Sequence, residues 1–253
     1  MAKTDEYQKA LREAINWDAY LLSHSGLPGP RGNIELGTVA GELASRDQIR
    51  RWLEWDARRA PTNTPEEFLA FCGVLGLGRL VAAGDHGVLA EIRTWASDPR
   101  WRVREGVAMA LQVVGDADFE QLLVEMKTWA SGTRLEQRAV AAALCEPRLL
   151  LPGRVGDVID VLDNITSSIP ARHDRRSDDF KALRKGLGYC WSVAVAADPT
   201  VGKPEMEKWM GSDDPDIRWI MRENLRKKRL ERMDREWVAH QLDVVAARGP
   251  STE

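Results

Sequence analysis

The chain has 253 residues, of which 43% are hydrophobic and 30% charged, a composition typical of a folded protein with much helical surface. Its net charge of −3 gives no whole-chain reason to expect nucleic-acid or membrane binding. Three scattered cysteines without a CxxC motif argue against a disulfide framework, and no stretch approaches the ~18–20 apolar residues of a membrane span. We therefore expect a cytoplasmic protein that does not enter the membrane.

Residues 1–45 are expected to form N-terminal capping helices. An amphipathic pattern predicts a helix over 4–24, the glycine- and proline-rich stretch 26–33 breaks the chain, and Asn33 can cap a helix over 34–44. A helix over 47–59 and another over 64–83 follow; the second begins with Thr64-Pro65-Glu66, a typical helix start. These segments lack the arginine of the later copies, which suits the atypical end of a repeat array.

Self-similar segments run through residues 86–230. The stretch Trp95-Ala-Ser-Asp98-Pro99, continued by Val103-Arg104-Glu105-Gly106-Val107, returns at shifts of 34, 80 and 114 residues. Each copy has apolar residues at helical period, and two begin with Asp-Pro, where Asp can cap the helix and Pro fits its first turn. Recurring small residues, among them Gly106, Gly186 and Gly188, indicate that neighbouring helices approach closely. The matched arginines are Arg104, Arg138, Arg184 and Arg218, spaced 34, 46 and 34 residues apart, and the longer spacing predicts a loop insertion at 169–177.

The pattern Asp-Pro…Val-Arg-x-x-Val-Ala-x-Ala-Leu resembles the second helix of HEAT repeats. The resemblance implies an all-α fold, a right-handed α-solenoid of about six helix pairs that forms one domain over 1–253. Residues 46–230 would be the repeats and residues 231–253 a C-terminal capping helix and tail, the charged helix running to about residue 247. In size and Trp/Arg content the chain is also similar, more weakly, to the HEAT-like DNA-alkylation-repair glycosylases, although no catalytic motif of that family matches residue by residue.

Two sets of residues repeat in register. The arginines Arg104, Arg138, Arg184 and Arg218 could contact phosphates or carboxylates from a concave face, or each could pair with an acid of a neighbouring repeat. We favour the second interpretation, because a charge repeated in register is most simply used within the array. The tryptophans at the ends of first helices are expected to pack between helices; they are Trp95, Trp129 and Trp209.

The candidate ligand-binding residues lie outside that register. Trp101 and Trp219 lie near the starts of arginine-bearing helices, and with Arg102 and Arg222 they could form a stacking, cationic surface, or simply be half-buried. A basic run follows in a segment, 171–232, whose net charge is +4. The run could contact a phosphate backbone, act as an import signal or cover a helix end; it consists of Arg226, Lys227, Lys228 and Arg229.

No motif indicates catalysis. The chain has no HExxH or Cys/His metal spacing, no serine elbow and no phosphate-binding or dinucleotide glycine pattern, so we predict no metal and no cofactor. We predict a HEAT-repeat scaffold that binds a macromolecular partner, a protein in the first place, on its concave face. The alternative is a DNA-binding protein related to the DNA-alkylation-repair glycosylases, which would make it an enzyme.

Overall fold

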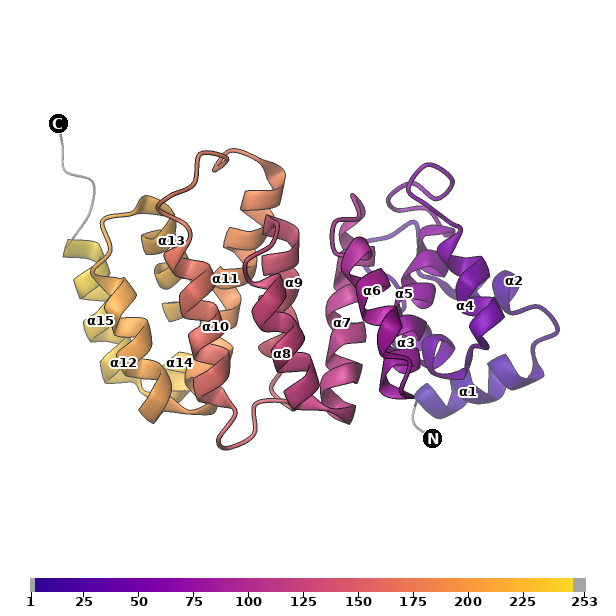
Figure 1. Ribbon diagram of the computed structural model, residues 1–253, viewed down its shortest axis with the longest axis horizontal. Coiled ribbons are helices and arrows are strands. Elements are labelled where there is room, and N and C mark those ends of the chain that lie inside the picture. The colour runs from indigo at the N-terminus through magenta and orange to yellow at the C-terminus, as the bar shows by residue number, and fades with distance from the viewer. Residues whose placement is uncertain (1–2, 248–253) are drawn as a thin grey trace. The chain divides into compact units, whose positions relative to one another are not determined.

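A computed structural model describes residues 3–247, and Figure 1 labels their helices. All regular structure in this range is helical, with fifteen α-helices, one short 3-10 helix and no strand. The predicted all-α fold is therefore confirmed. The chain divides into two compact units, Met1–Asp118 and Phe119–Glu253, called unit 1 and unit 2 below.

Unit 1 is built around one buried helix, α5 (Glu67–Ala82), in which fourteen of sixteen residues are buried. Against it pack α3 (Ile34–Leu43), α4 (Arg46–Leu53) and α7 (Trp101–Ala117). Glycines allow the close approach: a Cβ on Gly78 would lie 2.4 Å from the carbonyl oxygen of Ala110 on α7. The remaining helices of the unit are α1 (Lys3–Glu13), α2 (Trp17–His24), the 3-10 helix η1 (His86–Val88) and α6 (Leu89–Trp95).

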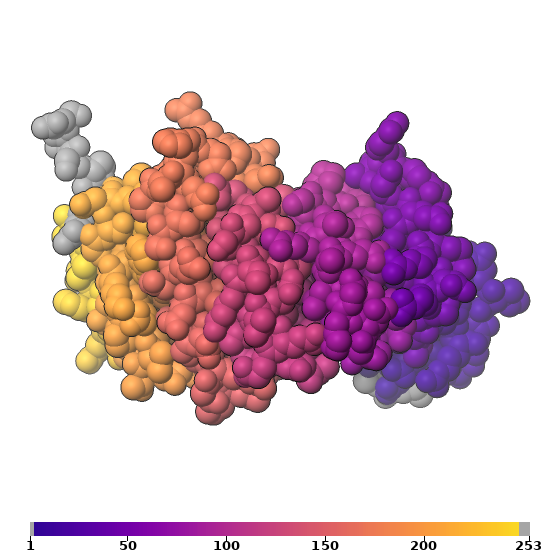
Figure 2. Space-filling model, in the orientation of Figure 1, coloured from indigo at the N-terminus to yellow at the C-terminus, as the bar shows by residue number. Residues whose placement is uncertain are grey.

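Unit 2 is centred on α11 (Asp178–Ala197), which packs against α9 (Arg134–Leu144) and α13 (Pro215–Leu225). Phe180 and Trp191 on α11 are fully buried. The predicted insertion is the loop before α11, and in Figure 2 this orange segment projects from the surface of unit 2. The other helices are α8 (Phe119–Trp129), α10 (Val155–Ser167), α12 (Pro199–Met210), α14 (Lys228–Met233) and α15 (Arg235–Ala247).

Three predicted helices are wrong in their bounds. The helix expected over 4–24 is two helices, because the side chain of Asn16 accepts the amide of Ala19 at 3.1 Å and starts α2 anew. The helix expected to reach residue 59 ends at Leu53. The C-terminal helix is divided at Asp234, whose side chain accepts the amide of Trp237 at 2.9 Å, and the predicted tail, 248–253, lies outside the described residues.

One of the two Asp-Pro starts is confirmed and the other is wrong. Asp214 caps α13 by accepting the amides of Asp216 and Ile217, with proline in the first turn. Asp98 does not cap α7; its carboxylate binds the buried guanidinium of Arg100 at 2.9 and 2.8 Å instead. The carboxylate oxygens of Asp98, which the repeat pattern predicted would cap the helix, thus bind a neighbouring side chain instead.

Candidate binding site

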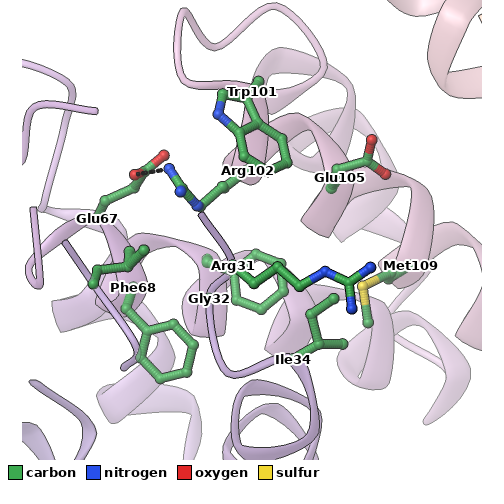
Figure 3. A pocket seen from close by; sticks show the side chains of 11 residues that line it. Arg31, Gly32, Ile34, Glu67, Phe68, Trp101, Arg102, Glu105 and Met109 are labelled. Carbon is green, nitrogen blue, oxygen red and sulfur yellow. Dashed lines mark hydrogen bonds and ion pairs between the residues drawn. The ribbon is translucent and has the colours of Figure 1, made fainter. Parts of the chain in front are cut away.

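A cavity of about 320 Å³ opens in unit 1 between the loop before α3, the start of α5 and one face of α7 (Figure 3). Its volume is at the lower end of the ~300–1,000 Å³ range of ligand pockets. Most of its lining is apolar, from Leu27, Ile34, Phe68, Phe71, Trp101 and Met109. Four charged side chains also line it: Arg31, Glu67, Arg102 and Glu105.

Phe71, on α5, is fixed between two glycines of neighbouring helices. A Cβ on Gly37 of α3 would lie 2.6 Å from its ring, and a Cβ on Gly106 of α7 would lie 3.0 Å from it. The ring also stacks on Phe68, with 5.9 Å between centroids. The missing side chains on α3 and α7 thus make room for two aromatic rings along the cavity wall.

The loop before α3 is held against the start of α5. Its ends are joined by the amide of Asn33, which donates to the carbonyl of Ser25 at 2.8 Å, and Gly26 supplies a left-handed turn with φ +74°. The amide of Gly29 donates to Oδ1 of Asn63 at 2.9 Å. These bonds place Arg31 beside the cavity, where its side chain extends across the view towards Met109 (Figure 3).

Glu67 and Arg102 form an ion pair beside the cavity (Figure 3). Nη1 of Arg102 lies 3.2 Å from Oε2 of Glu67, and that oxygen also accepts the amide of Asn63 at 2.7 Å. Nη2 of Arg102 donates to the carbonyl of Gly29 at 2.6 Å and to Oδ1 of Asn63 at 3.2 Å. Glu67 is fully buried and Arg102 is 7% exposed, so the pair is shielded from water. It joins α5 and α7 to the loop before α3, through Gly29, and to the loop before α5, through Asn63.

Two polar atoms of this pair are left without a hydrogen-bond partner among residues 3–247. They are Oε1 of Glu67 and Nε of Arg102, and solvent reaches neither atom. A buried polar atom without a partner costs about 1–3 kcal/mol, because it has lost its water without replacement. The pair therefore has one unused acceptor and one unused donor beside an apolar cavity.

Two large apolar side chains at the cavity are exposed. Ile34 is 49% and Trp101 is 46% exposed, unlike the buried Phe68 and Phe71 behind them. The Trp101 ring lies against Arg102, whose guanidinium carbon is 4.5 Å from the ring centroid. Exposed apolar side chains beside a hollow are typical of a recognition site rather than of a closed core.

Unit 2 contains a related arrangement with reversed charges. Arg184 of α11 lies 2.5 Å from Asp216 of α13 and 4.5 Å from the ring centroid of Trp219. Asp216 also binds Arg175 at 3.1 Å, and Arg175 lies 2.5 Å from Asp214. Burial acts to raise the pKa of Asp214, but the hydrogen bonds from Arg175 and two backbone amides outweigh it and hold the pKa below its usual value.

The basic run contributes to a second surface of unit 2. Tyr189 of α11 is 48% exposed, its hydroxyl accepts a hydrogen bond from Arg229, and the Arg229 guanidinium carbon lies 4.4 Å from the ring centroid. The ammonium of Lys227 lies 5.9 Å from the same centroid. Arg226 pairs with Glu223 at 2.7 Å, whereas Lys228 and Arg222 are exposed and half-buried, respectively. Part of the run is thus gathered around one aromatic ring.

The register arginines do not share one role. Arg184 pairs with Asp216 on α13, an acid of another helix, which is the kind of partner that the favoured interpretation named. Arg104 donates instead to the carbonyls of Asp98 and Pro99, and Arg218 donates to that of Asp213, so each binds the turn before its own helix. Arg138 has its Cγ 3.4 Å from where a Cβ on Gly186 would be, which places it against α11.

The register tryptophans lie at or next to the ends of α6, α8 and α12, as the repeat pattern indicated. Trp129 is fully buried, and its indole donates to Glu125 at 2.7 Å. Trp95 and Trp209 are half-buried, and the indole of Trp209 donates to Asp163 on α10 at 2.9 Å. Each tryptophan thus packs at a helix end, and two of them also bind a carboxylate.

Of the residues that line the cavity, only Trp101 and Arg102 were among the candidate binding residues predicted from the sequence. Arg102, which the sequence offered either for a stacking, cationic surface or for a half-buried role, lies buried against Glu67. Glu67 lies near the start of the helix expected over 64–83, and its pairing with Arg102 was not predicted. The signal that was available is the combination of an acid at the start of an otherwise apolar helix with an arginine 35 residues later, one repeat away.

Metal-ligand clusters, reactive thiols and membrane-spanning helices would each indicate a class of function if the described residues contained them. Within residues 3–247 no cluster of three or more His, Cys, Asp or Glu residues is placed to hold a metal ion. Burial raises the pKa of the Cys72 and Cys145 thiols, which keeps them protonated and poor nucleophiles. No described helix is long and apolar enough to cross a membrane.

No family model matches the chain, and neither a curated protein nor a solved structure matches it. The HEAT-like resemblance of its sequence therefore stays a prediction.

Proposed function

We propose that this protein is a non-enzymatic, cytoplasmic scaffold, a right-handed α-solenoid of about six HEAT-like helix pairs that binds a protein partner. In such an array α5 and α7 would be second helices of consecutive pairs, and their shared face would be part of the concave surface. The proposal rests above all on the cavity of about 320 Å³ in unit 1, with Ile34 and Trp101 exposed beside it. An apolar side chain of the partner would enter the cavity and supply most of the binding energy.

The test is selection of random displayed peptides on the purified full chain, followed by affinity measurements on the selected peptides. Ile34→Asp places a charge at the cavity, in the first helical position of α3, where an acid suits the helix dipole and should not disturb folding. The matched control is Val201→Asp, also in a first turn and 38% exposed, in unit 2. We expect Ile34→Asp to weaken binding at least about tenfold and the control to leave it unchanged. Peptides insensitive to Ile34→Asp would overturn the proposal.

A second candidate function is nucleic-acid binding by unit 2. It is favoured by one observation, the exposed ring of Tyr189 with Arg229 and Lys227 against it, since aromatic rings flanked by cations are the usual elements of single-strand binding. The association constant for a labelled single strand should fall steeply between about 50 and 200 mM salt, because each phosphate contact releases a counterion and contributes roughly −0.7 to the slope of log K against log salt. It should also fall in Tyr189→Ala. An absence of binding at low salt would remove this candidate, and release of an alkylated base from duplex DNA would test the kinship with glycosylases.

A further inference from the structure

We propose that the cavity of unit 1 recognises a primary carboxamide carried on an apolar stem, as in the side chain of a glutamine. The inference deepens the proposed function, on which it rests, by naming the chemistry that the anchoring side chain must have. It starts from the two buried atoms that lack partners, Oε1 of Glu67 and Nε of Arg102.

A primary carboxamide supplies what both atoms lack. Its NH₂ group can donate to Oε1 of Glu67 while its carbonyl oxygen accepts from the Nε–H of Arg102. A carboxylate has no hydrogen to give Glu67 and adds a like charge beside it. A cation such as an amidinium has no acceptor for Arg102 and faces its positive charge. Since the two side chains already form an ion pair, a neutral ligand with one donor and one acceptor is the best match.

The stem of the ligand must be apolar and short. Beyond the ion pair the cavity is bounded by Phe68, Phe71, Ile34 and Met109, none of which offers a hydrogen-bonding N or O atom. An apolar cavity of about 150 Å³ is sufficient for benzene, so the 320 Å³ here has room for two methylenes or a phenyl ring together with the amide. The remaining charged side chains, Arg31 and Glu105, carry opposite charges and so favour no charged ligand.

Solvent does not reach the two atoms, so a ligand binds them only after a neighbouring side chain moves, and Trp101 is the exposed side chain that lies against Arg102. Its ring lies on the Arg102 guanidinium and is nearly half exposed, so it can turn outward without disturbing the core. Entry of the ligand then exchanges a cation–π contact, worth about 0.5–2 kcal/mol, for hydrogen bonds to two atoms that had none. The indole N–H signal of Trp101, identified by its loss in Trp101→Phe, therefore reports on occupancy.

The first test uses three probes of nearly identical shape: benzamide, benzoate and benzamidinium. They are titrated into the full chain, with binding followed by NMR through the backbone amides of α5 and α7 and the Trp101 indole. We expect benzamide to bind at least about tenfold more tightly than either charged probe, the ratio that one mismatched buried polar group produces. Equal affinities, or a preference for either charged probe, would overturn the proposal even if every variant below failed to fold.

The second test reverses the preference. Glu67→Gln keeps an oxygen for the amide of Asn63 but removes the negative charge, so Arg102 faces the cavity uncompensated. Benzoate should then bind more tightly than benzamide. The matched control is Glu105→Gln, which removes a carboxylate of the same cavity but neither of the atoms without partners, and benzamide should stay first. A reversal in both variants would mean that net charge alone decides, which contradicts the proposal.

The third test separates the amide from its source. Two displayed peptides that differ only by glutamine and glutamate at the anchor position are compared for binding that Ile34→Asp abolishes. A preference for glutamine supports a protein partner as the source of the amide. If benzamide ranks first but neither peptide uses the cavity, the carboxamide site stands and the proposed protein partner fails. If peptides use the cavity without preferring glutamine, the partner stands and the carboxamide inference fails.

Discussion

Units 1 and 2 each hold an arginine between a carboxylate of the adjoining helix and the ring of a tryptophan, but with opposite polarity. In unit 1 the acid is on the earlier helix and the arginine on the later one, as Glu67 and Arg102. In unit 2 the arginine comes first, as Arg184, and the acid second, as Asp216. In both arginines Nε has no partner among the described residues.

The two pairs differ in their access to water. The side chains of Glu67 and Arg102 are 0% and 9% exposed, whereas that of Arg184 is 32% exposed and its partner Asp216 has a second arginine, Arg175. A pair whose arginine is partly exposed and whose acid has a spare partner adds little to stability and tolerates loss of that arginine. A buried pair without a spare partner is costly to break, because the remaining charge stays buried and unpaired. The pair in unit 1 therefore depends on both of its members, whereas the pair in unit 2 has a substitute for its arginine.

The largest expected effect on stability comes from removing one member of the ion pair in each unit. Glu67→Ala leaves Arg102 buried and should lower the free energy of unfolding by about 3–5 kcal/mol. Arg184→Ala leaves Asp216 bound to Arg175 and should cost about 1 kcal/mol or less. Urea denaturation followed by circular dichroism measures both. Equal losses would mean that both pairs contribute equally to stability despite their different exposure to water.

Replacement by alanine of two helical glycines, one in each unit, should change the stability in opposite directions. Gly78→Ala, in unit 1, puts a Cβ 2.4 Å from a carbonyl oxygen of α7 and should destabilise by about 1–3 kcal/mol through overpacking. Gly186→Ala, in unit 2, meets only the Cγ of Arg138 at 3.4 Å and should stabilise by about 0.5–1 kcal/mol, because alanine loses less backbone entropy in a helix. Thermal melts report both, and a destabilising Gly186→Ala would show that the helices there are as close as in unit 1.

Periodicity was sufficient to predict the helices but not their exact ends. Apolar residues at helical spacing indicated α7, α11 and α13, because a buried stripe must repeat every three or four residues, and the Thr64-Pro65-Glu66 start indicated α5. The breaks before Asn16 and at Asp234 were missed, since they depend on which polar side chain reaches a backbone amide. The same applies to Asp98, which repeats the cap position of α13 in sequence but binds Arg100 in the structure.

The cavity could not be predicted, since it depends on contacts between residues far apart in the chain. Gly29 and Arg102 are 73 residues apart, and Phe71 finds its place only because Gly37 and Gly106 lack side chains. The repeat pattern in the sequence set Trp101 and Arg102 apart from the repeated positions, and both line the cavity. The sequence also indicated close packing at Gly106, Gly186 and Gly188; a Cβ would lie 3.0 Å from a neighbour at Gly106 and Gly188, but 3.4 Å from one at Gly186.

The smallest expected effect concerns two aspartates whose pKa values are lowered in different ways. In unit 2 a hydrogen bond from Arg134 holds the pKa of Asp174 below its usual value, and in unit 1 the backbone amide of Arg59, with further help from Arg58, does the same for Asp56. Each carboxylate therefore adds stability that is present above the ordinary aspartate pKa of about 3.9 and is lost as the pH falls through the lowered value.

Salt should distinguish the two aspartates. At about 1 M salt the screening length falls to about 3 Å, which weakens an exposed ion pair but not a short bond to a backbone amide. The pKa of Asp174 should therefore rise towards its usual value when salt is added, while that of Asp56 moves less, as measured by carbon-13 NMR titration of the carboxyl groups. Arg134→Gln should give Asp174 the same rise without salt. If both aspartates shift equally with salt, the Asp174 pKa is not set by its ion pair, and the loop before α11 is held to α9 by other contacts.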